Sequence, residues 1–339
     1  MTGEEDEGYT KRKRADVLVV GGVGYLGYNI ARYHREVGDS VAVVARHSSV
    51  ARRQKLAEEL ASLEARIKIV DDLGRADEAL RVLEELGCPH ISYIVVGRLH
   101  GSFRELLRSN AELPALWTDI ISRNCDSSLI VYTSNILAAG RPRKAGEPIK
   151  EEENHLAGHE PVGLHSLSKM EGERRVLSVC RRGRARVAVI RAGLLVGRWC
   201  YHSEWRLFYR LAKIGVSFRG GPLIHAVAAV DVARAGDFIA RKADAPRCMW
   251  AYAVGWRGSL SDLHVALSSM LGHKIRVRIP APSGGMLYRI PLLPPIVREI
   301  AKQQGLVFEP ALLKNLGFSF TPIEAALKDA ANWMKEVWG

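Results

Sequence analysis

Three glycines at a regular spacing are the clearest chemical signal in the sequence. Gly21, Gly24 and Gly27 follow a short apolar run and open a segment with helical spacing. Glycine suits a tight turn at which the backbone must approach a pyrophosphate, and the first N–H groups of the following helix attract the phosphate charge. Because strand, turn and helix occur in this order, the sequence predicts a dinucleotide site that also includes Tyr25 and Leu26.

The residue that ends the second predicted strand distinguishes NAD from NADP. An acidic side chain there accepts a hydrogen bond from the ribose 2′-hydroxyl, whereas an arginine accommodates a 2′-phosphate. This chain has Arg46 at that point, and a guanidinium binds phosphate well. Ser48, Ser49, Arg52 and Arg53 follow closely. The sequence therefore predicts NADP as the cofactor in preference to NAD, with a surface arginine as the alternative interpretation.

Strands and helices must alternate to position these residues. Apolar runs at 17–20, 40–45, 66–70, 91–96, 129–133 and 187–191 predict buried parallel strands. Helical spacing at 30–37, 76–86, 113–122 and 166–181 predicts the helices between them. This alternation predicts an α/β fold, with a doubly wound parallel Rossmann sheet covered on both faces.

The predicted organisation has three parts. Opposite blocks of charge at residues 1–14 predict a disordered tail. Residues 15–198 are expected to form the Rossmann domain. Residues 199–339 are expected to form a smaller substrate lobe, with 225–254 returning to the Rossmann core and a final helix at 323–337.

Composition excludes several other classes of protein. No apolar run approaches the ~18–20 residues of a membrane span, and the charged start does not read as a signal peptide, so we expect a cytoplasmic protein. The net charge is +12, but the basic stretches contain no aromatic stacking residues, which argues against nucleic acid as a partner. Five scattered cysteines without a CxxC spacing predict buried free thiols and no metal site.

With the glycine loop in place, the chain resembles the extended short-chain dehydrogenase/reductase family. That family includes NAD(P)-dependent nucleotide-sugar epimerases and dehydratases and the 3β-hydroxysteroid dehydrogenases. The resemblance rests on Asp72-Leu73, Val96-Gly97, Asn110 and the segments 132–140, 191–197, 225–235 and 316–322. It implies that Asp72 and Leu73 lie beside the adenine, and that Val96, Gly97 and Thr133 line the cofactor site.

The family's catalytic set is a serine or threonine, a tyrosine, and a lysine four residues after the tyrosine. Lys169 matches the lysine, but His165 stands where the tyrosine belongs and Asn135 where the serine usually lies. The resemblance implies that Lys169 holds the nicotinamide ribose. Imidazole has a pKa of ~6.5, so we predict that His165 is the proton donor and acceptor and that Asn135 orients the substrate. Thr133 or Ser134 could take the role of the serine.

Two functions remain open. The first is an oxidoreductase or epimerase/dehydratase that acts on a hydroxyl or carbonyl group; the second is a non-catalytic NADP-binding sensor or structural subunit. For an enzyme, the segments 199–206 and 219–223 are candidate linings of the substrate site, and Arg198, Arg206 and Arg219 could meet the diphosphate of a nucleotide sugar. The apolar stretch 286–297 could instead admit a sterol- or isoprenoid-like substrate or contact a membrane surface. A homodimer is compatible with either function.

Overall fold

The computed structural model of the chain describes residues 15–126, 128–144, 146–151, 159–242, 244–281 and 305–339. The predicted tail at 1–14 and the apolar stretch 286–297 lie outside the described residues.

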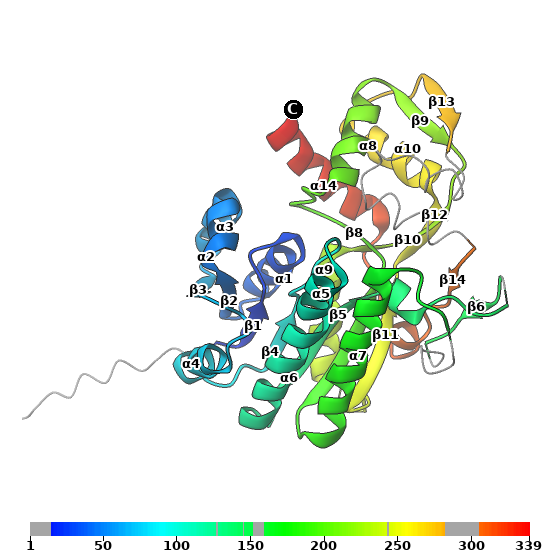
Figure 1. The fold of residues 1–339 in the computed structure, drawn as a ribbon. Helices are drawn as coiled ribbons and strands as arrows, with labels where there is room; N and C mark the ends of the chain where they lie inside the picture. Colours follow the sequence, from blue (N-terminus) through cyan, green and yellow to red (C-terminus); the bar gives the residue numbers. More distant parts are fainter. Residues whose placement is uncertain (1–14, 127, 145, 152–158, 243, 282–304) are drawn as a thin grey trace, which may run out of the picture.

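A seven-stranded parallel sheet forms the centre of the structure, in the order β11-β7-β5-β4-β1-β2-β3 (Figure 1). Its strands in chain order are β1 (Val17–Val20), β2 (Val41–Arg46), β3 (Arg66–Val70), β4 (Ile91–Ile94), β5 (Leu129–Asn135), β7 (Arg186–Ala192) and β11 (Cys248–Ala253). The predicted doubly wound α/β fold is confirmed.

Helices cover both faces of this sheet. The first face carries α1 (Tyr25–Glu36), α3 (Gln54–Ser62) and α9 (Ala229–Arg241), and the second carries α4 (Ala76–Leu86), α6 (Leu113–Asn124) and α7 (Leu164–Arg182). Val17 and Val19 of β1 belong to the core on the first face, and Leu18 and Val20 to the core on the second. This division explains why the strand is an unbroken apolar run rather than an alternating one.

The strand order reverses between β1 and β4, which are neighbours in the sheet. The chain that leaves β1 continues to β2 on one side, whereas the chain that leaves β4 continues to β5 on the other. In doubly wound sheets, ligands bind in the crevice that opens at this point, outside the carboxyl ends of the strands. The glycine loop between β1 and α1 lies there.

A C-terminal lobe packs against this layer (Figure 1). It contains the three-stranded sheet β12-β10-β8 and the two-stranded sheet β13-β9. These elements are β8 (Leu194–Val196), α8 (Ser203–Lys213), β9 (Val216–Arg219), β10 (Leu223–Ala228), β12 (Trp256–Ser259), α10 (Leu260–Leu271), β13 (Val277–Pro280) and α14 (Ile323–Trp338). The three helices share one apolar core, which includes Trp205 and Trp333.

The remaining described elements are short. They are α2 (His47–Arg52), α5 (Phe103–Leu107), a π-helical turn (Arg108–Glu112), a 3-10 turn (Ile136–Ala139), the paired β6 (Pro148–Ile149) and β14 (Val307–Phe308), and α13 (Leu312–Asn315).

The prediction of five free thiols is wrong, because four of the cysteines form two disulfides. Cys88 bonds to Cys125 and Cys180 bonds to Cys248, which leaves Cys200 as a buried free thiol. Each pair joins segments that lead into neighbouring strands, β4 with β5 and β7 with β11. The amino ends of neighbouring parallel strands lie at the same edge of a sheet, so residues far apart in sequence meet there.

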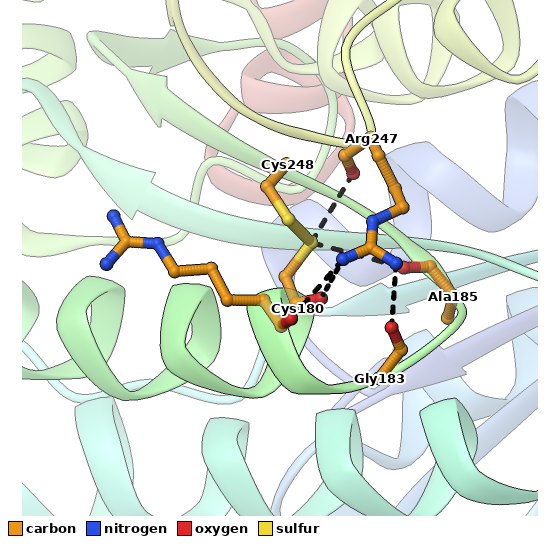
Figure 2. Close-up of a disulfide and its surroundings, with 6 residues drawn as sticks. Cys180, Gly183, Ala185, Arg247 and Cys248 are labelled. Carbon is orange, nitrogen blue, oxygen red and sulfur yellow. Dashed lines mark hydrogen bonds between the residues drawn. A yellow bond between two sulfur atoms is a disulfide. The ribbon is translucent and has the colours of Figure 1, made fainter.

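The side chain of Arg247, the residue before Cys248, lies beside the second disulfide (Figure 2). Its guanidinium donates to the carbonyl oxygens of Gly183 and Cys180, at 2.8 and 3.0 Å. A cation at this position satisfies carbonyls at the end of α7 that have no partner within the helix. The disulfide and the arginine together fix the amino edge of β7 and β11.

Reducing the disulfides is expected to destabilise the fold. Each crosslink restricts the unfolded chain and typically contributes about 2–4 kcal/mol. Thermal unfolding should therefore occur at a lower temperature in the presence of a reductant. Alkylation of the unfolded protein should label one cysteine without reductant and all five after reduction. Labelling of all five without reductant would show that the pairs are not bonded.

Candidate functional site

The glycine loop has the geometry that the sequence predicts. Gly21 has a φ of +83°, and a Cβ atom on it would lie 2.9 Å from the backbone of Val96. A Cβ on Gly27 would lie 2.3 Å from the carbonyl oxygen of Gly22. A Cβ on Gly24 would meet no atom within 3.7 Å, since its nearest neighbour is at 3.8 Å. The outer two glycines are thus required by the fold, whereas a Cβ on Gly24 would make only ordinary van der Waals contacts at the start of α1.

Gly24 lines a cavity of about 420 Å³ between the sheet and the C-terminal lobe. The predicted site residues that line it are Gly21, Gly24, Tyr25, Leu26, Gly27, Arg46, Leu73, Val96, Gly97, Thr133, Asn135, His165 and Lys169. Of the predicted cofactor-binding and catalytic residues, Asp72 alone does not line the cavity. Its carboxylate accepts from the Gly74 N–H at 2.9 Å and from Arg108 at 2.6 Å, and so shapes the turn before α4.

Arginine and serine side chains line the cavity near the end of β2. Arg46, Ser49 and Arg52 come from the last residue of β2 and from α2. Arg53 donates to the carbonyl oxygen of Val23 at 2.9 Å, and its guanidinium lies 5.3 Å from the centre of the Tyr201 ring. Arg53 therefore links the glycine loop to the C-terminal lobe, while Arg46 is exposed at the rim.

Lys169 is the buried cation of the site. It lies on α7 one turn after His165, and its ammonium donates to the carbonyl oxygen of Thr133 at 2.9 Å. Burial lowers the pKa of Lys169 to about 8, and the nearby Glu173 opposes this shift. Since 165, 169 and 173 are spaced by four residues, all three side chains lie on the stripe of α7 that faces the sheet. The helix thereby delivers an imidazole and an ammonium to one wall of the cavity.

The end of β5 supplies hydroxyl groups beside Lys169. The side-chain oxygens of Thr133 and Ser134 are buried, and neither has a hydrogen-bond partner within the described part of the chain. Buried hydroxyls are rarely left unsatisfied, so these two are suited to a ligand. Asn135 also lines the cavity, but its side-chain oxygen accepts from the Leu137 N–H at 2.9 Å and caps the turn that follows.

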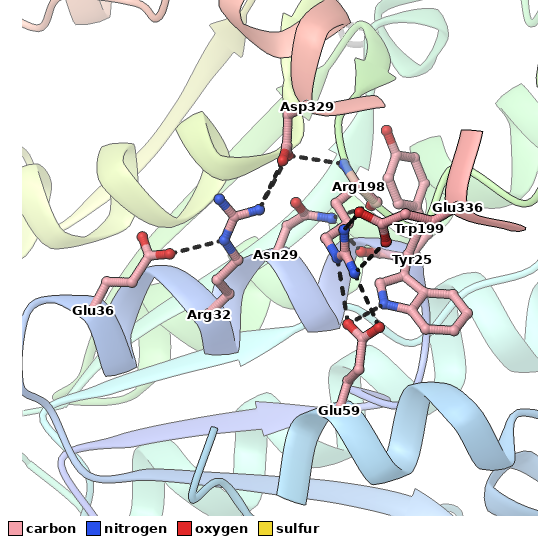
Figure 3. A network of polar contacts seen from close by, with 9 residues as sticks. All are labelled: Tyr25, Asn29, Arg32, Glu36, Glu59, Arg198, Trp199, Asp329 and Glu336. Carbon is pink, nitrogen blue, oxygen red and sulfur yellow. Dashed lines mark hydrogen bonds and ion pairs between the residues drawn. The ribbon is translucent and has the colours of Figure 1, made fainter. Parts of the chain in front are cut away.

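The structure places Arg198 away from the cavity, contrary to the hypothesis that it meets a diphosphate. Its guanidinium contacts Glu59 of α3 at 3.2 Å and Glu336 of α14 at 2.9 Å (Figure 3). Trp199 donates to the same Glu59 at 2.8 Å. Arg206 lies over the Trp338 ring, and neither it nor Arg219 is a lining residue. Arg198 instead fixes the segment that leads into the cavity wall.

That wall comes from the segment 199–206, a candidate lining of the substrate site in the sequence, although Tyr201, His202, Glu204 and Trp205 were given no individual roles. Tyr201, His202, Glu204 and Trp205 line the cavity opposite the glycine loop. Burial raises the pKa of Glu204 to about 7 and lowers the pKa of His202 to about 4. Glu204 is 2% exposed, and one of its carboxylate oxygens has no hydrogen-bond partner among the described residues. A buried carboxyl of this kind is typical of functional sites.

Glu204 should make stability depend on pH. The pKa of Glu204 is about 7 in the folded protein and close to 4.5 in the unfolded chain. The stability that the protonated carboxyl contributes is therefore complete below pH 4.5 and is lost as the pH rises through 7. The shift corresponds to about 3 kcal/mol. Relative to the wild type, Glu204→Gln should therefore gain up to that amount of unfolding free energy between pH 5 and pH 8, measured by urea denaturation. An equal difference at both pH values would contradict the assignment.

Two further classes of site are not seen in the described ranges. No three His, Cys, Asp or Glu side chains among the described residues gather in a way that could hold a metal ion. Nor does any helix in the described part of the chain combine the length and apolarity needed to cross a membrane.

Comparison with known proteins identifies the family. Residues 17–255 match the model of the NAD dependent epimerase/dehydratase family. The chain belongs to this family. The match covers the glycine loop, the end of β5, His165 and Lys169, together with the cavity wall at 201–205. No curated protein sequence is similar enough to give a significant match.

Solved structures share the fold of this epimerase/dehydratase family member over nearly its whole length. UDP-N-acetylglucosamine 4-epimerase from Methanobrevibacter ruminantium M1, solved with UDP-N-acetylmuramic acid, is 16% identical with a TM-score of 0.70, covering 96% of this chain and 99% of that one. UDP-glucose 4-epimerase from Thermotoga maritima, solved with UDP-glucose, has the same identity and TM-score, with 95% and 99% coverage. MoeE5 with UDP-glucuronic acid and NAD is 16% identical with a TM-score of 0.68, again covering 95% and 99%.

Proposed function

We propose that the protein is an NADP-preferring enzyme that carries out a redox step at a hydroxyl or carbonyl group of a nucleotide sugar. One observation carries the proposal. The buried ammonium of Lys169, the imidazole of His165 and the unpartnered hydroxyls of Thr133 and Ser134 line the same cavity as the glycine loop. A dinucleotide held by the loop and a substrate that meets these groups would share that space.

Each residue has a distinct task in this proposal. The bound dinucleotide supplies hydride transfer. His165 takes the proton from the substrate hydroxyl as the carbonyl forms and returns it when the carbonyl is reduced. Thr133 or Ser134 donates a hydrogen bond to the substrate oxygen, and Lys169 holds the nicotinamide ribose. Asn135 orients the substrate through its amide N–H groups, because its oxygen is already engaged by Leu137.

The cavity supports a nucleotide sugar over a sterol- or isoprenoid-like substrate. The wall opposite the glycine loop is polar, with Tyr201, His202 and Glu204. The apolar stretch that suggested a sterol, 286–297, lies outside the described residues and adds no support. Related structures were solved with UDP-sugars.

Replacing Arg46 tests the cofactor preference. Arg46→Ala should weaken NADP binding by about 10-fold or more, since a charged hydrogen bond to the 2′-phosphate contributes roughly 1.5–3 kcal/mol. NAD, which lacks that phosphate, should bind almost as before. Calorimetric titration of both cofactors gives the comparison. Arg123→Ala, an exposed arginine on α6, is the matched control. Equal losses for NADP and NAD would contradict the preference.

The activity itself is tested with purified protein, NADP or NAD, and a panel of UDP-sugars. Reduced nicotinamide is followed by absorbance. Products are separated by chromatography, because an epimerisation leaves no net change in the cofactor. Turnover of a UDP-sugar supports the proposal. Tight binding of dinucleotide without turnover of any panel member would instead favour the non-catalytic alternative, for which the histidine at 165 and the engaged oxygen of Asn135 are the supporting observations.

A further inference from the structure

Three buried polar atoms on one side of the cavity have no hydrogen-bond partner among the described residues. They are the hydroxyl oxygen of Tyr25, one carboxylate oxygen of Glu204 and the indole nitrogen of Trp205. The three residues are at most 3% exposed, and all of them line the cavity. Polar atoms buried in this way are costly unless something satisfies them. A ligand that enters the cavity from this side would do so.

These residues lie together although they come from two lobes. Tyr25 is the first residue of α1, and its ring lies 5.6 Å from the ring of His202, the residue that precedes α8. Glu204 and Trp205 belong to the first turn of α8. Tyr25 and Trp205 also share one apolar core. The start of α8 therefore packs against the start of α1 on one side of the cavity.

The chemistry of this group fits the hydroxyl groups of a sugar. The indole N–H can only donate, an ionised carboxylate can only accept, and a phenol can do both. A polyol offers donors and acceptors on adjacent carbons and can satisfy all three atoms at once. A flat apolar ring offers neither donors nor acceptors and would leave all three atoms unsatisfied.

The charges on the same wall disfavour an acidic sugar. Glu204 is the one acidic residue among the described residues that line the cavity, and one of its carboxylate oxygens has no hydrogen-bond partner in the described part of the chain. Burial keeps His202 neutral, with a pKa of about 4, although its ring lies 3.7 Å from the other oxygen of Glu204. Arg198 is held by Glu59 and Glu336 outside the cavity. Arg53 also lines the cavity, where its guanidinium lies over the Tyr201 ring and donates to the Val23 carbonyl.

We propose that Tyr25, Glu204 and Trp205 form a specificity subsite that binds the hydroxyl groups of a neutral sugar and rejects a sugar that carries a carboxylate. This inference rests on the proposed function, because it requires a nucleotide-sugar substrate. Glu204 determines the specificity by like-charge repulsion against the wrong sugar as well as by hydrogen bonds to the right one.

The test compares three ligands on the full chain saturated with NADP. Calorimetry at pH 8 gives the Kd values of UDP, UDP-glucose and UDP-glucuronic acid. For the wild type, UDP-glucose should bind about 10-fold tighter than UDP-glucuronic acid. Glu204→Gln should reduce this ratio to about 2-fold or less, mainly because UDP-glucuronic acid binds more tightly. Tyr25→Phe should weaken UDP-glucose while leaving the Kd of UDP unchanged.

The outcomes separate the two proposals. An improved affinity cannot result from a damaged fold, and an unchanged Kd for UDP shows that the nucleotide site is intact. If UDP-glucose binds but the ratio is the same in the wild type and in Glu204→Gln, the subsite is wrong and the nucleotide-sugar function stands. If none of the three ligands binds the wild type, the proposed nucleotide-sugar function is wrong. The proposed subsite is then wrong as well, because it requires such a substrate. At pH 6, where Glu204 is mostly protonated, the wild-type ratio should also decrease.

Discussion

Replacing His165 with alanine is expected to lower kcat by about 100- to 10,000-fold, the usual contribution of a general acid or base. His165 is 4% exposed, lies in the first turn of α7 and lines the cavity one helical turn before Lys169. The affinity for NADP should change little, because Lys169, the glycine loop and Arg46 remain. Stopped-flow turnover and calorimetric titration of NADP measure the two quantities on the same preparation.

Matched variants separate chemistry from packing. His165→Tyr restores the residue that the family uses four positions before its lysine, and it should retain turnover. His165→Phe has nearly the same shape without the hydroxyl and should not. His90→Ala removes an exposed histidine at the opposite edge of the sheet and should behave like the wild type. Wild-type kcat in His165→Ala would remove His165 from the mechanism.

Breaking the ion pair between Glu173 and Arg191 is expected to produce the largest loss of stability. The two side chains are at most 1% exposed and meet through bonds of 2.7, 3.0 and 3.2 Å. They connect α7 to β7 one helical turn after Lys169. Removing one partner leaves a buried charge without compensation, which costs about 3–5 kcal/mol. Arg191→Met should therefore lower the urea midpoint sharply without changing the dependence of the unfolding free energy on urea.

A double variant shows whether the loss of stability comes from the unpaired buried charge or from the change in packing. Glu173→Gln with Arg191→Met removes both charges, and it should recover a large part of the stability that Arg191→Met loses. Arg184→Ala, which breaks an exposed pair with Asp126 in the same region, should cost less than about 1 kcal/mol. Equal losses in the double and single variants would show that packing, not charge, explains the effect.

Much of the fold follows from the sequence because its parallel strands are buried on both faces. β1 and β3 occur at the predicted positions, and the other predicted strands differ by a few residues at their ends. The first helix begins at Tyr25 rather than at 30, because Gly24 is its N-cap and Gly27 lies in its first turn. Two helices between β2 and β3 were not predicted. α2 buries none of its residues, so it carries no apolar periodicity.

The residues of the candidate site also differ in how well the sequence predicts them. The glycine loop and the β5 and α7 residues could be located from sequence, because each has a fixed offset from a strand or from another motif residue. The sequence suggested the segment 199–206 as a lining but did not single out Glu204, since one acidic residue at the start of a helix is ordinary in sequence and its burial depends on the contact between two lobes. The disulfides required the strand order, which places β4 beside β5 and β7 beside β11.

The two disulfides and the cavity lie at opposite edges of the central sheet. Both crosslinks lie where strands begin, and the cavity lies where strands end. The crosslinks restrain the strands at the edge where they begin, so we expect the motions that admit a ligand to occur mainly at the opposite edge, where the cavity lies. We therefore expect substitutions in the loops that line the cavity to leave the strand register intact. The disulfides that hold the strands in register lie at the other edge of the sheet.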